Sequence, residues 1–126
     1  MRAIDANVLV RIIIRDDARQ AAAADRFVER GAWVSLLALA EASWVLTSVY
    51  DRSAAELAIS IRMLLDHEHL ALQDPDVIEA ALEAFRKRPT VGFSDCLLLE
   101  MARKAGHLPL GTFDRGLSGL AGSQKL

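Results

Sequence analysis

Hydrophobic and polar residues follow two different periods along this chain. Short apolar stretches at residues 2–5, 32–36, 69–73 and 108–113 predict four strands. Apolar residues at helical spacing, or simply in apolar segments too long for strands, predict helices. These expected helices span residues 7–15, 18–30, 37–50, 53–68, 76–88 and 94–106. Strands that alternate with longer helices are typical of a parallel sheet with helices on both faces, so the pattern predicts an α/β fold.

Several residues predict where these helices begin and end. Ser53 and Glu56 have the spacing of a capping box at a helix N-terminus. Pro75 suits a first helical turn, and Gly106 suits the position just after a helix. The Gly-rich segment 114–126 has no clear pattern.

Composition narrows the class of protein. The chain has 126 residues, of which 52% are hydrophobic and 25% charged, and we expect one globular domain over residues 1–126. A net charge of -2 lacks the basic excess of non-specific nucleic-acid binders, although a divalent cation can reverse the field of an acidic pocket. The single cysteine, Cys96, cannot form an intramolecular disulfide. With no apparent signal peptide or membrane span, we expect a cytoplasmic protein without membrane association.

Two acidic residues interrupt apolar segments. Asp5 ends the first expected strand, where α/β proteins form sites, although it could equally cap the following helix. Glu41 has Leu37, Trp44 and Val45 one turn away, so it lies on an apolar stripe, where a solvated glutamate is not expected. We therefore predict a functional role for Glu41 and a place in the core for Trp33 and Trp44.

Two further aspartates are candidates. Asp95 begins an expected helix and by itself suggests a cap, whereas Asp114 follows the fourth expected strand as Asp5 follows the first. Four carboxylates converging at one sheet edge would repel one another, and a hard divalent cation would remove that repulsion. The absence of Cys or His pairs at ligand spacing argues against zinc.

Four segments resemble a known family. They are "MRAIDANVLV", "LALAEASWVL", "FSDCLLLEMARKAG" and "LGTFDRGL", and in this order they resemble PIN-domain ribonucleases, most of all the VapC-type toxins of bacterial toxin–antitoxin pairs. The resemblance implies a three-layer α/β/α sandwich with a short, mostly parallel sheet. It implies cleavage of RNA, with a transfer RNA or ribosomal RNA loop as substrate, dependent on Mg²⁺ or Mn²⁺. Implied partners are a cognate VapB-type antitoxin and a second copy of the chain.

The resemblance also assigns residues to roles. The family's acidic positions, which would bind metal and carry catalysis, are matched by Asp5, Glu41, Asp95 and Asp114, and its polar supporting positions by Asn7 and Thr112. The sequence departs from the family in three places. Ala6 replaces a common hydroxyl residue, Leu98 and Leu99 stand where some members carry a further acid, and the usual C-terminal strand is barely visible in "SQKL".

Two other classes compete with this hypothesis. A haloacid-dehalogenase-like phosphohydrolase also uses a strand-end aspartate and Mg²⁺, but it needs a second aspartate where this chain has Asn7. A non-catalytic Mg²⁺-binding signalling or interaction domain would need a phosphorylatable aspartate at the end of a central strand. Asp51 is the candidate, yet it follows an expected helix.

Overall fold

The computed structural model describes all 126 residues, which pack as two compact units, residues 1–74 and 75–126. The first unit contains, in order, β1 (Arg2–Ile4), α1 (Ala6–Ile13), α2 (Ala18–Val28), β2 (Ala32–Val34), α3 (Leu36–Ser48), α4 (Ala54–Leu65) and β3 (Leu70–Leu72). The second contains α5 (Pro75–Lys87), the 3-10 helix η1 (Pro89–Val91), α6 (Phe93–Ala105), β4 (Leu110–Thr112), α7 (Arg115–Ser118) and β5 (Ser123–Lys125). The single domain expected from the sequence stays a prediction.

The first unit is built on a parallel three-stranded sheet with the order β1-β2-β3. Because the strands are parallel, their carboxyl ends lie at one edge, and Asp5 directly follows the strand β1 there. At the same edge Gln73, just after β3, joins neighbouring segments. Its N–H donates to the carbonyl of Val34 over 2.8 Å, and its Oε1 accepts from the N–H of Leu36 over 2.9 Å.

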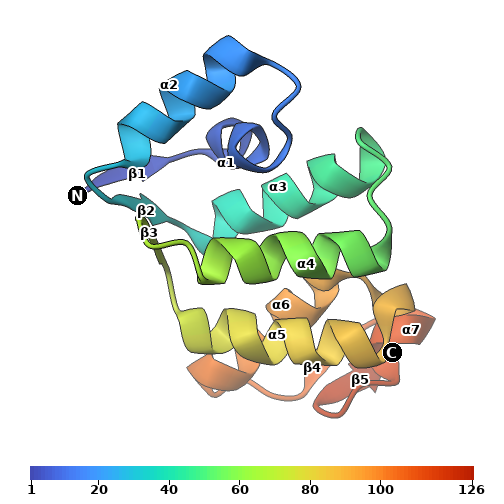
Figure 1. Ribbon diagram of the computed structural model, residues 1–126. Helices are drawn as coiled ribbons and strands as arrows, with labels where there is room; N and C mark the ends of the chain where they lie inside the picture. Colours follow the sequence, from blue (N-terminus) through green and yellow to red (C-terminus); the bar gives the residue numbers. More distant parts are fainter. The chain divides into compact units, whose positions relative to one another are not determined.

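Four helices pack around this sheet, and α3 and α4 lie side by side (Figure 1). Helix α1 contacts both α2 and α3. The interior is aliphatic, and its side chains that are at most 2% exposed include Leu9 of α1, Val28 of α2, Leu39 and Leu46 of α3, and Ile61 and Leu64 of α4. Burial of each such side chain stabilises the fold by roughly 1.5–3 kcal/mol before conformational entropy is counted.

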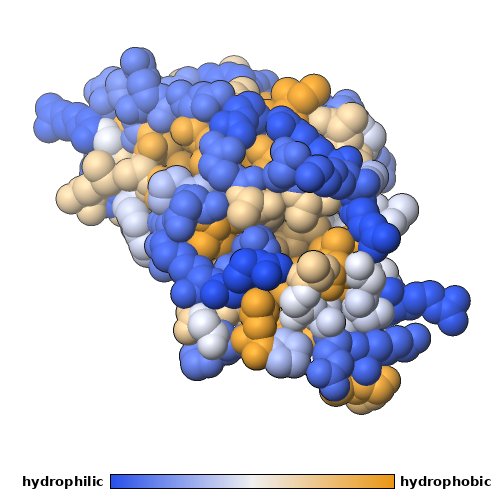
Figure 2. Space-filling model, turned by 90° about the horizontal axis from the view of Figure 1, so that it is seen from below, coloured by the Kyte–Doolittle hydropathy of each residue, from blue (hydrophilic) through white to orange (hydrophobic).

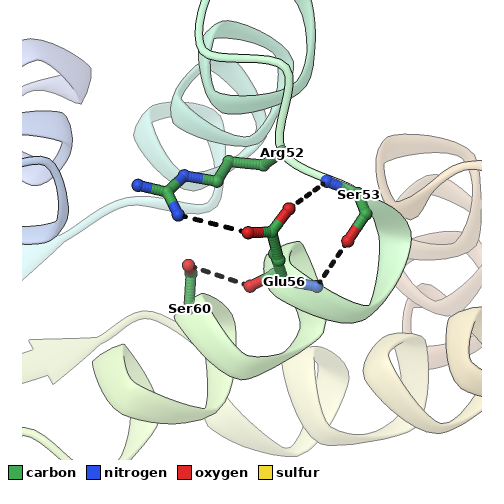
Figure 3. Close-up of polar contacts among 4 residues, drawn as sticks. All are labelled: Arg52, Ser53, Glu56 and Ser60. Carbon is green, nitrogen blue, oxygen red and sulfur yellow. Dashed lines mark hydrogen bonds and ion pairs between the residues drawn. The ribbon is translucent and has the colours of Figure 1, made fainter.

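The predicted capping box at the start of α4 is present (Figure 3). The N–H of Glu56 donates to Ser53 Oγ over 3.2 Å, and the N–H of Ser53 donates to Glu56 Oε1 over 2.9 Å. Arg52 adds an ion pair to Glu56 at 3.5 Å. The hydrogen bonds with Ser53 hold the pKa of Glu56 below its usual value. The box therefore satisfies two helix-end N–H groups and fixes where α4 begins.

The second unit has α5 and α6 packed against each other at its centre. The rings of Phe85 and Phe93 meet edge to face, with centroids 6.0 Å apart. Gly92 precedes α6 with a φ of 90°, a backbone conformation that favours glycine. Helix α6 ends at Gly106, in the left-handed conformation predicted for that position, and the Gly106 N–H donates to the carbonyls of Ala102 and Arg103.

The strand β4 pairs in parallel with β5, in a ladder separate from β1-β2-β3. The turn between them contains α7, which supplies the crossover that a parallel pair requires. The C-terminal strand, barely visible in the sequence, is thus real and covers Ser123–Lys125. The expected α/β class with a short parallel sheet is confirmed. The sequence pattern suggested a single sheet, but the hydrogen bonds form two separate ladders, β1-β2-β3 and β4-β5.

Candidate functional site

Asp5 serves as the N-cap of α1. Its Oδ1 accepts a hydrogen bond of 3.0 Å from the N–H of Val8. The structure therefore confirms the capping role that the sequence left open. The cap occupies Oδ1, and the exposed side chain presents Oδ2 at the carboxyl edge of the sheet, so capping and metal binding are compatible.

Asn7 lies in the first turn of α1, two residues after Asp5, and is exposed. Both side chains line a surface pocket of about 400 Å³. The rest of its lining comes from α1 and α2, namely Val8, Arg11, Gln20, Ala23, Ala24 and Phe27. Asp5 and Asn7 form the polar end of this pocket, just after β1. Side chains of α1 and α2 form its more apolar floor.

Glu41 is exposed on α3, contrary to what its apolar neighbours suggested. Leu37 and Trp44, one turn away on either side, are also exposed, by 69% and 63%. The stripe around Glu41 is therefore a solvent-facing apolar surface and not a core face. The prediction that Trp44 belongs to the core is wrong, and Trp33 is 39% exposed as well. Because α3 is apolar on all sides, residue spacing alone does not reveal which side is buried.

The charge of Asp114 acts on Asp95 within the second unit. Asp95 lies in the first turn of α6, while Gly92 takes the N-cap position, so the suggested capping role of Asp95 is wrong. Burial raises the pKa of Asp95, and the negative charge of Asp114 raises it further. The pKa of Asp95 is raised even though the residue lies in the first turn of a helix, where the helix dipole stabilises a carboxylate. Such a perturbed acid beside a like charge is typical of a functional site.

Asp114 is held by a small hydrogen-bonded turn. Its N–H donates to Thr112 Oγ1 over 2.9 Å, and its Oδ2 accepts from the N–H of Leu117 over 2.7 Å, which caps α7. Thr112 therefore contacts the backbone of Asp114, and its role in orienting the carboxylate stays a prediction. The turn fixes the backbone of Asp114 and one of its carboxylate oxygens, so the position of its charge is well defined.

The structure brings together some of the predicted residues. Asp5 and Asn7 line one pocket in the first unit, and Asp95, Asp114 and Thr112 are associated in the second. No group of three or more His, Cys, Asp or Glu side chains is close enough to hold a metal ion. The joint four-carboxylate site therefore stays a prediction. The donor set of Asp95 and Asp114 nevertheless suits a hard divalent cation, since their charges repel and their ligand atoms are oxygens.

Other candidates fit less well. Asp51 lies between α3 and α4 and not at the end of a strand, so it lacks the position of a phosphorylated aspartate. A second surface pocket, of about 650 Å³, contains none of the predicted site residues, and His67 and His69 are part of its lining. Phe113, directly before Asp114, is 80% exposed, which the sequence did not indicate. Its place in an apolar segment was the only available signal, and it favoured burial.

A family model for the PIN domain matches residues 3–123. The chain belongs to the PIN domain family. PIN domains are in general metal-dependent nucleases, and they typically use divalent metal ions. No curated protein and no solved structure matches the chain. None of its helices combines the length and hydrophobicity that crossing a membrane would take.

Proposed function

We propose that this protein is a Mg²⁺- or Mn²⁺-dependent endoribonuclease and the toxin of a toxin–antitoxin pair of the VapC type. The single observation that carries the proposal is that Asp95, partly buried, lies within reach of the charge of Asp114, which Thr112 supports, in a chain that belongs to the PIN family. The order of the four segments around Asp5, Glu41, Asp95 and Asp114 supports the finer subtype. The proposed substrate is a transfer RNA or ribosomal RNA loop.

Each residue has a distinct role in the proposed mechanism. Asp5, Asp95 and Asp114 would hold the cation, and Glu41 would either join them or position the attacking water. Thr112 accepts a hydrogen bond from the Asp114 N–H and so fixes the backbone there, and Asn7 would orient Asp5. When bound, the cation supplies an activated water and stabilises negative charge on the scissile phosphate. The water oxygen would bond to phosphorus in line with the P–O3′ bond, which breaks, and the 3′-oxygen would take up a proton, leaving a 5′-phosphate and a 3′-hydroxyl.

The first test is cleavage of structured RNA with Mg²⁺ or Mn²⁺, with and without EDTA. We expect cleavage that EDTA abolishes, and we expect Asp95→Asn to remove it. Asp76→Asn is the matched control, because Asp76 is also a first-turn aspartate in the second unit but pairs with Lys104 at 3.0 Å. Cleavage that survives EDTA or Asp95→Asn contradicts the proposal, and so does equal loss in both variants.

The proposal includes two protein partners. The pocket beside Asp5 and Asn7 offers an antitoxin segment both an apolar floor and a polar end, so a bound segment would cover this part of the site. On α4, Ile59 is 67% exposed and Met63 is 42% exposed, which suits contact with a second copy of the chain. Light scattering tests the second contact: we expect a dimer that Ile59→Glu converts to a monomer. A monomeric wild-type protein contradicts it.

A further inference from the structure

We propose that Arg88 binds a backbone phosphate of the RNA about two nucleotides from the one that is cleaved, in a pocket at the opposite end of α7 from Asp114. The inference rests on the proposed function and extends it to a second contact with the substrate. It uses residues of the second unit alone.

The pocket lies between α5 and the segment that follows α7, and its volume is about 360 Å³. Arg88 directly follows α5, and Gly119 ends α7. Both residues line the pocket, which we call the Arg88 pocket. Most of the remaining walls are small or aliphatic side chains, namely Ala80, Ala84, Leu120 and Ala121.

The guanidinium of Arg88 lies directly against the backbone of Gly119. A Cβ atom at Gly119 would be only 2.6 Å from Arg88 Nη1. The backbone angles of Gly119, φ -79° and ψ -9°, are open to any residue, so its conformation does not require glycine. What glycine provides at this position is space for the guanidinium.

The guanidinium of Arg88 has no ion-pair or hydrogen-bond partner within the protein. Three other cations of the second unit do have carboxylate partners: Lys87 pairs with Glu83 at 3.6 Å, Arg103 with Glu100 at 3.1 Å and Lys104 with Asp76 at 3.0 Å. Glu83 is the one carboxylate that lines the Arg88 pocket, and Lys87 offsets its charge. The pocket is therefore positively charged.

Simpler explanations do not account for this placement. Arg86 and Lys87 in the last turn of α5 complement the helix dipole, but Arg88 lies beyond that turn. Hydrophilic side chains occupy much of the face shown in Figure 2, so an exposed charge by itself marks no site. Arg115 is unpaired too, but it adjoins Asp114 and belongs to the site already described. The contact with Gly119 in a pocket distinguishes Arg88.

A phosphate is the ligand that suits this pocket. A guanidinium presents several N–H donors in a planar fork, which matches two oxygens of one phosphate. It also stays charged at any pH at which the protein is folded. A nuclease substrate carries such a phosphate at every nucleotide.

Helix α7 sets the separation between the Arg88 pocket and Asp114. Asp114 is its N-cap and Gly119 its C-cap, five positions later. Five residues at about 1.5 Å each correspond to about 7.5 Å along the helix axis. Phosphates of a stacked strand advance by about 3.4 Å per nucleotide, so this length spans about two nucleotides. With the cleaved phosphate at Asp114, Arg88 reaches a nearby phosphate and positions the strand.

The first test is the salt dependence of RNA binding. Anisotropy of a short labelled single strand, in EDTA to prevent cleavage, gives the affinity at several salt concentrations. Arg88→Ala should weaken binding about five-fold at about 0.1 M salt. Its plot of log affinity against log salt should be shallower by about 0.7, the value for one phosphate contact to a single strand.

Three further variants separate a seated contact from general charge. Gly119→Ala should also weaken binding, because its methyl group displaces the guanidinium. Arg88→Lys keeps the charge and should keep the salt dependence, with lower affinity. Arg86→Ala is the matched control, since Arg86 is an exposed neighbour outside the Arg88 pocket. It should behave as the wild-type protein does. All four positions are exposed, so every variant should keep the wild-type melting temperature.

The second test locates the phosphate. A neutral methylphosphonate replaces one linkage at a time in a cleavable RNA. At a linkage about two nucleotides from the cleaved bond, this change should weaken binding to the wild-type protein about five-fold. The same change should have no further effect in Arg88→Ala, because the two partners of one contact are then both removed.

The possible outcomes are distinguishable. Normal affinity and salt dependence in Arg88→Ala, while the wild-type protein cleaves RNA, overturn the inference and leave the proposed function intact. Equal losses in Arg86→Ala and Arg88→Ala overturn it as well, because the effect is then diffuse. A linkage-specific loss in a protein without metal-dependent cleavage overturns the proposed function instead. If inorganic phosphate raises the melting temperature through Arg88 but RNA affinity does not depend on Arg88, the pocket holds a free anion and the inference is wrong.

Discussion

The negative charge of Asp114 raises the pKa of Asp95, adding to the effect of burial on the same carboxyl group. Asp76 gives the opposite case in the same unit, because a hydrogen bond from Lys104 lowers its pKa. Both aspartates lie in the first turn of a helix, so the difference comes from their neighbours and not from the helix dipole. A comparison of variants at the two positions therefore measures how far the charge of Asp95 destabilises the folded protein.

Removing the charge of Asp95 should stabilise the metal-free protein. We expect Asp95→Asn to raise the melting temperature at neutral pH by about 2 °C, because the folded state no longer buries a charged carboxylate and no longer holds it near Asp114. Asp76→Asn should lower it slightly, since an attractive pair is lost. Differential scanning fluorimetry in EDTA measures both variants, and shifts of the same sign would contradict the electrostatic explanation.

The pH dependence of these two variants should also differ. The raised pKa means that folded Asp95 binds its proton more tightly than the unfolded chain, so stability from this group falls as pH rises above its ordinary value of 3.8. The gain from Asp95→Asn should therefore grow between about pH 4 and pH 7. For Asp76 the pKa is lowered, so its contribution is present above 3.8 and is lost as the pH falls.

Added metal should act on Asp95 directly. Mg²⁺ or Mn²⁺ that binds only the folded protein raises its melting temperature, and the rise grows with metal concentration. We expect this rise in the wild-type protein and in Asp76→Asn, and a much smaller rise in Asp95→Asn. An equal response of all three proteins to metal would place the bound cation elsewhere.

Two substitutions at Asp114 should separate its structural from its catalytic role. Asparagine is as good an N-cap as aspartate, so Asp114→Asn should keep the free energy of unfolding within about 0.5 kcal/mol, whereas Asp114→Ala should lose about 1 kcal/mol. Both should lose RNA cleavage by about 100-fold or more, because the charge is gone. Denaturant unfolding and a cleavage assay give the two readouts, and an active Asp114→Asn would remove Asp114 from the mechanism.

Ser53→Ala should destabilise the fold without affecting the site. The loss of the N-cap hydrogen bond of α4 should lower the free energy of unfolding by about 1 kcal/mol. It should also reduce the loss of stability in acid, because Glu56 has its pKa lowered by Ser53 and contributes stability that disappears as the pH falls. Urea unfolding at two pH values measures this, and RNA cleavage should stay at the wild-type level.

Cys96 should be unreactive in the folded protein. Burial is the main cause that raises the pKa of its thiol to about 11, and the nearby carboxylates of Asp95 and Glu100 raise it further. At about pH 8 only about one thiol in a thousand is then ionised. We expect a thiol reagent to modify Cys96 only after denaturant unfolds the chain, and rapid reaction of the native protein would contradict the burial.

Local sequence signals were reliable wherever they act within a few residues. The capping box of Ser53 and Glu56, the first-turn position of Pro75 and the left-handed Gly106 all follow from the chemistry of neighbouring backbone groups, and all are present. The same holds for the end of β1 at Ile4, one residue before the strand end expected at Asp5. The separate pairing of β4 with β5 could not be predicted, since strand partners depend on segments that are distant in the chain.

The sequence by itself determined the order of the longer helices and the first four strands, the α/β class and the placement of acidic residues at strand and helix ends. Only the tertiary structure decided which sides of an all-apolar helix are covered, and it left Glu41 and Trp44 in solvent. It also decided that Asp95 feels the charge of Asp114, although 18 residues separate them in the chain. The physical reason is that capping and turn formation are local, whereas burial and charge repulsion depend on what the folded chain brings nearby.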